Sequence, residues 1–174
     1  ATMAPRHEFT PVQNAAQGVG GGQNQGILIV RHKTSGKVYI EKRIPPCLIT
    51  QGDTRREVRA MGQCSSHPNI VRLITYDLNT PAHIPYGSLY LQHCELGSLD
   101  ALMLRYAARG QYLADEGFVW KVFFDLSLAL AKLHFGADEQ LSRARAAIGK
   151  DAKPIAGWNP ITHRDIKPSN IFLT

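Results

Sequence analysis

The sequence has few cysteines, no long apolar run and no block of one charge, and each absence removes a class of protein. Its three cysteines are an odd number without a Cys-x-x-Cys pair, so they indicate neither a disulfide framework nor a zinc site. No stretch reaches the roughly 18 apolar residues of a membrane span, and the first twenty residues lack the apolar core of a signal peptide. We therefore expect reduced thiols in an intracellular protein, cytoplasmic or nuclear, without a membrane partner.

The formal charge of +6 is spread along the chain and forms no run of five or six basic residues, so nucleic acid is not expected as a partner. A basic nucleic-acid-binding module remains an alternative that rests on net charge alone. With 174 residues and 44% hydrophobic content, the chain is long enough for one domain or part of one. It begins at Ala1 and ends at Thr174, directly after an apolar run, so we expect a piece of a longer protein.

The pattern of apolar residues predicts strands first and helices later. Residues 1–16 contain two prolines and no sustained period, which favours a flexible lead-in. Short β-rich runs predict four strands, over residues 27–30, 38–44, 70–76 and 88–92. The first two form a hairpin. Helix signals predict three helices, over residues 50–63, 99–105 and 119–133. The first is expected to start at Thr50, and the last has one long apolar face. Residues 136–160 lose this period and predict an inserted surface loop, with one helical turn at most.

The strongest chemical signal is the segment His163-Arg164-Asp165-Ile166-Lys167-Pro168-Ser169-Asn170. In a tight loop, an acid, a lysine two positions later and an amide five positions later can converge on one reacting phosphate. The spacing suits a base, a charge stabiliser and a metal ligand. An ordinary polar turn before a strand is the alternative reading of the same residues.

This segment resembles the catalytic loop of eukaryotic protein kinases, whose signature is His-Arg-Asp followed by Asn. The resemblance implies that Asp165 accepts or orients the proton of the substrate hydroxyl and that Asn170 holds Mg²⁺. It implies that Arg164 meets an acidic or phosphorylated activation segment. Lys167 stands where serine/threonine kinases usually carry a lysine, which neutralises charge on the transferred phosphoryl group.

A second signal is Lys42, which ends a β-pattern 16 residues after Gly26 and resembles the strand lysine that bridges the ATP phosphates in kinases. Glu57 follows on the predicted helix and resembles the glutamate that pairs with that lysine. His67-Pro68-Asn69-Ile70-Val71 also looks like the kinase family. Taken alone, Lys42 would be a solvated lysine on a strand and Glu57 part of a solvated helix face.

The glycine-rich segment 18–26 departs from the kinase pattern Gly-x-Gly-x-x-Gly, which falls here on Gly21, Gln23 and Gly26. Without a Cβ, glycine backbone N–H groups can approach phosphate oxygens closely. The middle glycine is missing, and Gly20 and Gly22 are candidates for its role. On the same alignment Leu28 covers the adenine, and Ile40 is a bulkier roof over the purine than the usual alanine.

The run Leu89 to Leu99 resembles the last strand of the small lobe, the hinge and the next helix of a kinase. The resemblance implies that Leu91 is the gatekeeper, that Gln92 and Cys94 offer backbone groups to adenine, and that Ser98 lies near the ribose. A strand followed by a helix cap fits the same residues. The insertion 136–160 separates Leu133-His134 from the catalytic loop by an unusual length.

The fold class we predict is α+β and kinase-like, with a five-stranded antiparallel small lobe, one main helix and the first helices of an incomplete large lobe. The expected parts are a lead-in, the small lobe, the hinge and the start of the large lobe: 1–16, 17–92, 93–98 and 99–174. The expected activity is transfer of phosphate from ATP, with Mg²⁺, to serine or threonine of protein substrates. Residues 170–173 with Lys167 lean towards the NIMA-like group. Because no Asp-Phe-Gly occurs, a pseudokinase or truncated kinase that binds partners is the alternative. The sequence leaves the oligomeric state open.

Overall fold

The computed structural model of the chain describes residues 2–3, 6–14, 26–137, 139–151 and 153–174. Contacts between residues divide the chain into two compact units. The first, which we call the sheet unit, contains Ala1–Ser65 and Val71–His93, and the second, the helical unit, contains Ser66–Ile70 and Cys94–Thr174. The chain therefore crosses between the units before residue 70 as well as at the expected hinge, where the division falls between His93 and Cys94.

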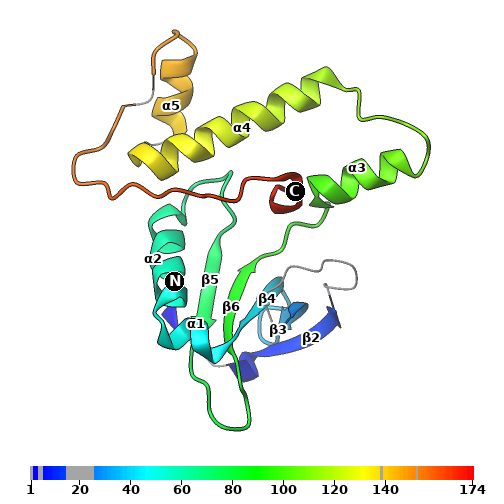
Figure 1. The fold of residues 1–174 in the computed structure, drawn as a ribbon, viewed down its shortest axis with the longest axis vertical. Helices are drawn as coiled ribbons and strands as arrows, with labels where there is room; N and C mark the ends of the chain where they lie inside the picture. The colour runs from blue at the N-terminus through cyan, green and yellow to red at the C-terminus, as the bar shows by residue number, and fades with distance from the viewer. Residues whose placement is uncertain (1, 4–5, 15–25, 138, 152) are drawn as a thin grey trace. The chain divides into compact units, whose positions relative to one another are not determined.

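The sheet unit is built on one sheet with the strand order β1-β5-β6-β4-β3-β2 (Figure 1). Strands β2 to β6 pair antiparallel, as the sequence predicted. A two-residue strand, β1, pairs parallel with β5 at one edge. The strands are β1 (Thr2–Met3), β2 (Phe9–Asn14), β3 (Ile27–His32), β4 (Val38–Ile44), β5 (Leu73–Asp77) and β6 (Gly87–Gln92).

The structure differs from the expected flexible lead-in over 1–16. A 3-10 turn, η1 (Arg6–Glu8), leads directly into β2, which is the fifth antiparallel strand. The two prolines had argued against a helix here, and the structure has an edge strand instead. Pro11 is tolerated because β2 lies at the edge of the sheet and its register with β3 shifts between Pro11 and Gln13.

Two helices replace the single helix expected over 50–63. These are α1 (Pro46–Thr50) and α2 (Asp53–Cys64), with Gly52 at φ 84° between them. Thr50 ends α1 and does not cap α2, because its hydroxyl donates back to the carbonyls of Pro46 and Cys47 at 3.2 and 2.9 Å. The core of the unit consists of Ile44, Leu73 and Leu89, against which side chains of both helices pack.

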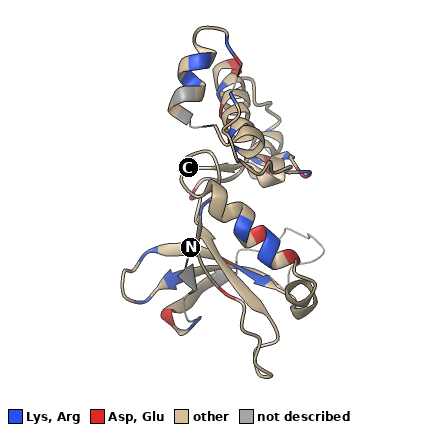
Figure 2. Cartoon of the chain, turned by 90° about the vertical axis from the view of Figure 1, so that its left-hand side faces the viewer, with Lys and Arg blue, Asp and Glu red and all other residues tan. Residues whose placement is uncertain are grey.

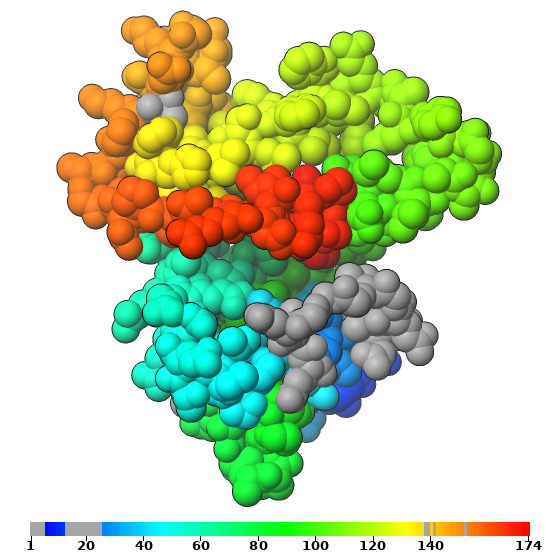
Figure 3. All heavy atoms as spheres, in the orientation of Figure 1, coloured from blue at the N-terminus to red at the C-terminus, as the bar shows by residue number. Residues whose placement is uncertain are grey.

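Within its described residues, the helical unit holds three α-helices and a small two-stranded sheet. These are α3 (Leu99–Ala107), α4 (Glu116–Phe135), α5 (Glu139–Ala146), β7 (Gly97–Ser98) and β8 (Phe172–Leu173). Asp115 caps α4 by accepting a hydrogen bond from the Phe118 N–H at 3.0 Å. The C-terminal segment runs beside α4 (Figures 1 and 3) and is held by a bond from the Ile161 N–H to the Leu133 carbonyl at 2.9 Å.

The insertion 136–160 is more ordered than the sequence predicted, because it contains the eight-residue helix α5. Its two ends meet at the end of α4. The Trp158 Nε1–H donates to the Leu133 carbonyl at 3.0 Å, and the Lys132 ammonium lies 4.6 Å from the centre of the Trp158 ring. The insertion thus leaves and rejoins the chain at one place, so it can add residues without displacing the segment that follows.

Charge and thiol chemistry agree with the composition. Lys and Arg alternate with Asp and Glu along α2 (Figure 2). The described cysteines Cys47, Cys64 and Cys94 form no disulfide. Among the helices of the described ranges, none has the length and apolar character needed to cross a membrane.

Candidate active site

The sheet unit carries one candidate group of functional residues, an ion pair. The Lys42 Nζ on β4 lies 2.8 Å from the Glu57 Oε1 on α2. The ion pair predicted from the sequence is therefore present. Because side chains alternate along a strand, Ile40, Lys42 and Ile44 share one face of the sheet, which we call the inner face. Lys42 and Glu57 keep 24% and 38% of their side-chain surface exposed, so a ligand can reach the ammonium.

Strand register decides which side chains lie beside Lys42 on the inner face. Ile27 on β3 is directly opposite Lys42, and Ile29 is directly opposite Ile40. Leu28 is opposite Glu41, on the other face of the sheet, which we call the outer face. The expectation that Leu28 covers the adenine is wrong, because counting from Gly26 placed the strand one residue out of phase. Ile27 takes that place beside Lys42.

Of the predicted phosphate-contacting glycines, Gly20, Gly21 and Gly22 lie outside the described residues. Gly26 is described and adopts φ 134°, and its carbonyl accepts a hydrogen bond from the Arg43 N–H at 3.1 Å. This bond joins the start of β3 to β4 next to Lys42. The shape of the glycine loop itself stays a prediction.

At the predicted hinge, Leu91 lies opposite Ile40 on the inner face and packs partly into the core. The Gln92 N–H donates to the Arg72 carbonyl at 2.9 Å, and burial raises the pKa of the Cys94 thiol. Ser98 caps α3, because its hydroxyl accepts from the Ala101 N–H at 3.1 Å. The contacts of these residues with adenine and ribose remain predictions.

The helical unit carries another candidate group of functional residues, the catalytic loop. Asn170 donates through Nδ2 to the Asp165 carboxylate at 2.8 Å and to the Asp165 carbonyl at 2.9 Å. The Lys167 Nζ lies 3.0 Å from the other carboxylate oxygen of Asp165. The short turn η2 (Pro168–Asn170) brings the amide back to the acid. The acid, lysine and amide predicted from spacing alone therefore converge.

These contacts set the charge state of Asp165. Its hydrogen bond with Lys167, followed by that with Asn170, lowers the pKa of the carboxyl below its ordinary value. The carboxylate is also solvent-exposed, with 61% of its side-chain surface accessible. An ionised carboxylate has about four lone-pair sites, so those left by Lys167 and Asn170 can accept the proton of a hydroxyl.

Arg164, directly before the acid, carries backbone strain that the sequence does not reveal. Its φ of 65° is the left-handed conformation, and among the described residues it is the only non-glycine residue with positive φ. Such a conformation costs an ordinary L-residue roughly 1–2 kcal/mol. The bonds from Asn170 to Asp165 and from the Asp165 N–H to His163 Nδ1, at 3.3 Å, hold the loop in this shape.

Asn170 fits the role of a magnesium ligand as one member of a larger set. Because its Nδ2 donates to Asp165, its Oδ1 points away and can offer the amide oxygen that Mg²⁺ accepts. Among the residues that the structure describes, no group of three or more His, Cys, Asp or Glu could hold a metal ion.

Comparison with known proteins gives several related kinases, although no family model matches the chain. It is 32% identical over 168 residues to the G2-specific protein kinase nim-1 of Neurospora crassa, covering 89% of this chain and 18% of that one. It is 36% identical over 160 residues to the G2-specific protein kinase fin1 of Schizosaccharomyces pombe, covering 83% and 21%. It is 30% identical over 152 residues to human serine/threonine-protein kinase Nek2, covering 83% and 28%.

The five-stranded sheet, the Lys42–Glu57 ion pair and the convergent loop of Asp165 and Asn170 agree with these similarities. These similarities support a protein kinase catalytic domain of the serine/threonine type over residues 1–174. Within that class the chain is similar to the NIMA group, to which nim-1, nimA and Nek2 belong, as residues 170–173 had suggested. The chain spans 18% to 28% of the length of these relatives.

Proposed function

We propose that the complete protein transfers the γ-phosphoryl group of ATP to serine or threonine hydroxyls of protein substrates. The observation that carries this proposal is the catalytic loop, where Lys167 and Asn170 both contact the carboxylate of Asp165. The kinase relatives support it. The alternative of a pseudokinase that binds partners gains no support from the site, since Lys42, Glu57, Asp165 and Asn170 are all in place.

In the proposed reaction the substrate hydroxyl oxygen attacks the γ-phosphorus, the bond from this phosphorus to the β–γ bridging oxygen breaks, and ADP leaves. Asp165 accepts the hydroxyl proton at its carboxylate. Because the pKa of Asp165 is lowered, its carboxylate stays ionised and is a weak base. It therefore mainly orients the substrate hydroxyl and takes the proton late in the reaction, which suits a loose transition state.

The cations of the site serve the phosphates. We propose that Lys42, held by Glu57, pairs with the α- and β-phosphates, and that Lys167 neutralises charge on the transferred group. Asn170 would hold Mg²⁺, which when bound neutralises negative charge between the β- and γ-phosphates. The roof of the nucleotide site would consist of Ile27, Ile40 and Leu91.

The test is phosphate incorporation by the complete protein into a generic protein substrate. Asp165→Asn should lower kcat by about 10²–10⁴-fold, the usual contribution of a general base. Asp151→Asn is the matched control, because Asp151 is an exposed aspartate of the insertion. Phosphoserine and phosphothreonine in the product support the proposal. Equal incorporation by wild type and Asp165→Asn would refute it.

A further inference from the structure

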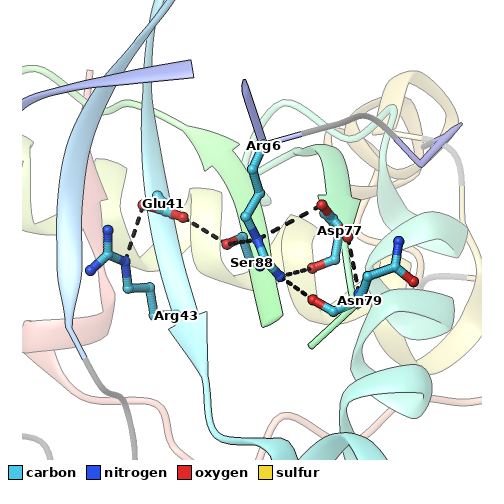
Figure 4. Close-up of polar contacts among 6 residues, drawn as sticks. All are labelled: Arg6, Glu41, Arg43, Asp77, Asn79 and Ser88. Atoms are coloured by element: carbon cyan, nitrogen blue, oxygen red, sulfur yellow. Dashed lines mark hydrogen bonds and ion pairs between the residues drawn. The ribbon is translucent and has the colours of Figure 1, made fainter. Parts of the chain in front are cut away.

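The outer face of the sheet, opposite the Lys42–Glu57 pair, carries buried charge that the proposed reaction does not use. Glu41, Asp77 and Ser88 are only 5%, 9% and 0% exposed. They come from three neighbouring strands, β4, β5 and β6 (Figure 4). Buried carboxylates are costly unless cations and hydrogen bonds compensate them, so this cluster requires a partner.

Arg6, from the turn η1 in the N-terminal segment, is that partner. Its Nε donates to the Ser88 hydroxyl at 3.1 Å and lies 3.8 Å from an Asp77 carboxylate oxygen. Its Nη2 donates to the carbonyls of Asp77 and Asn79 at 3.2 and 2.6 Å. In Figure 4 the side chain reaches down between the strands that carry Asp77 and Ser88. One guanidinium thus ties the N-terminal segment to β5 and β6.

Ser88 relays this contact to β4. A serine hydroxyl has one hydrogen to donate, and its lone pairs accept the hydrogen bond from Arg6. The hydroxyl therefore donates to the Glu41 Oε1, at 2.6 Å. Arg43 donates to the other carboxylate oxygen of Glu41 at 3.3 Å. Arg6 and Arg43 together balance Glu41 and Asp77, so removal of Arg6 leaves a buried excess of negative charge.

Phe9, three residues after Arg6, packs against Tyr90 of the sheet. Its ring stacks on Tyr90 with centroids 3.8 Å apart and an angle of 13° between the planes. Tyr90 lies opposite Glu41 in the register of β4 and β6 and is 1% exposed. Because Glu41 and Asp77 are buried, their charges interact with neighbouring groups more strongly than exposed charges do.

We infer that Arg6 is a positioning residue, which acts through Ser88 and Glu41 to fix strand β4 and with it the Lys42 ammonium. Glu41 and Lys42 are consecutive and point to opposite faces of one strand. A clamp on Glu41 therefore restricts the backbone from which Lys42 reaches Glu57. The inference rests on the proposed function only for the measurements that use ATP turnover. The position of the Lys42 ammonium can be tested without catalysis.

The experiment compares Arg6→Met with Arg31→Met in the complete protein. Arg31 is the matched control because it belongs to the same sheet and its exposed side chain donates to the Gly36 carbonyl in the turn. The first readout is the rate at which acetic anhydride acylates Lys42 relative to Lys37, measured by mass spectrometry. We expect Arg6→Met to raise this ratio about fivefold, the size of coupling within one hydrogen-bond network, and Arg31→Met to leave it unchanged.

The second readout separates positioning from stability. Arg6→Met should raise KM for ATP about fivefold or more while KM for the protein substrate stays constant. Adding Glu41→Gln to Arg6→Met should change both readouts less than Glu41→Gln does alone, because both substitutions break the same path to β4. Should Arg6→Met fail to fold, Arg6→Lys, which keeps the charge without the guanidinium geometry, is expected to show a smaller change of the same kind.

A lower melting temperature with unchanged Lys42 acylation would reduce Arg6 to a structural residue and overturn the inference. Strictly additive effects of Arg6→Met and Glu41→Gln would also overturn it, because they exclude action through Glu41. Changed acylation in a protein whose wild type shows no phosphate transfer would sustain the inference and refute the proposed function.

Discussion

Replacement of Gly136 by alanine tests how the insertion closes on α4. Gly136 ends α4 at φ 70°, and a Cβ there would lie 2.4 Å from Cδ2 of Trp158. The left-handed conformation costs alanine roughly 1–2 kcal/mol, offset by about 0.4–1 kcal/mol because alanine restricts the unfolded chain. The overlap with the ring adds about 1–3 kcal/mol, the usual cost of extra volume in a packed site. The expected loss in free energy of unfolding is about 2–4 kcal/mol.

Gly149→Ala is the matched control for this prediction. Gly149 lies in the same insertion at φ 64°, but a Cβ there would meet nothing within 4 Å. Its expected cost is the conformational part alone, about 1 kcal/mol. The difference between the two variants therefore measures the contact with Trp158.

Thermal unfolding followed by circular dichroism gives the assay. Each kcal/mol corresponds to roughly 2–4 °C in a domain of this size, so the two variants should differ by several degrees. Trp158→Ala should relieve the overlap, which makes the double variant Gly136→Ala/Trp158→Ala more stable than the sum of the single losses. Equal losses for Gly136→Ala and Gly149→Ala would refute the reasoning.

Three further predictions concern the candidate site. Ile27→Ala should raise KM for ATP roughly tenfold, because a loss of about 1.4 kcal/mol of apolar contact lowers affinity tenfold. Leu28→Ala, the control, should leave KM for ATP within about twofold. Equal effects of the two substitutions would contradict the register of β3. Lys167→Met should raise the pKa of Asp165, because the wild-type pKa is lowered mainly by Lys167, so the carboxyl should protonate at higher pH in the variant. An NMR titration of the Asp165 carboxyl carbon, with exposed Lys150→Met as control, checks this, and an unchanged midpoint would contradict it. Glu57→Gln should cost less than about 1 kcal/mol of stability, because the pair is partly exposed. Its kcat/KM for ATP should nevertheless fall at least about tenfold, and a stable variant with full activity would remove the role assigned to the pair.

Local motifs were the most reliable part of the prediction from sequence. Asp165, Lys167 and Asn170 lie within six residues, and a chain that turns over so short a distance has few ways to arrange them. The Lys42–Glu57 pair was also predictable, because a strand lysine and a helix glutamate occurred in the order of a known family. Four of the five antiparallel strands and the long helix α4 followed from hydrophobic periodicity.

The sequence by itself thus determined the class of protein, the order of its elements and the chemistry of the catalytic loop. Only the tertiary structure decided that β2 completes the sheet, that Ile27 and not Leu28 lies beside Lys42, and that Arg6 neutralises charge on the outer face. These features depend on register and on contacts between residues up to 82 positions apart. Spacing along the chain carries little information about such contacts, because they exist only once separate strands have paired.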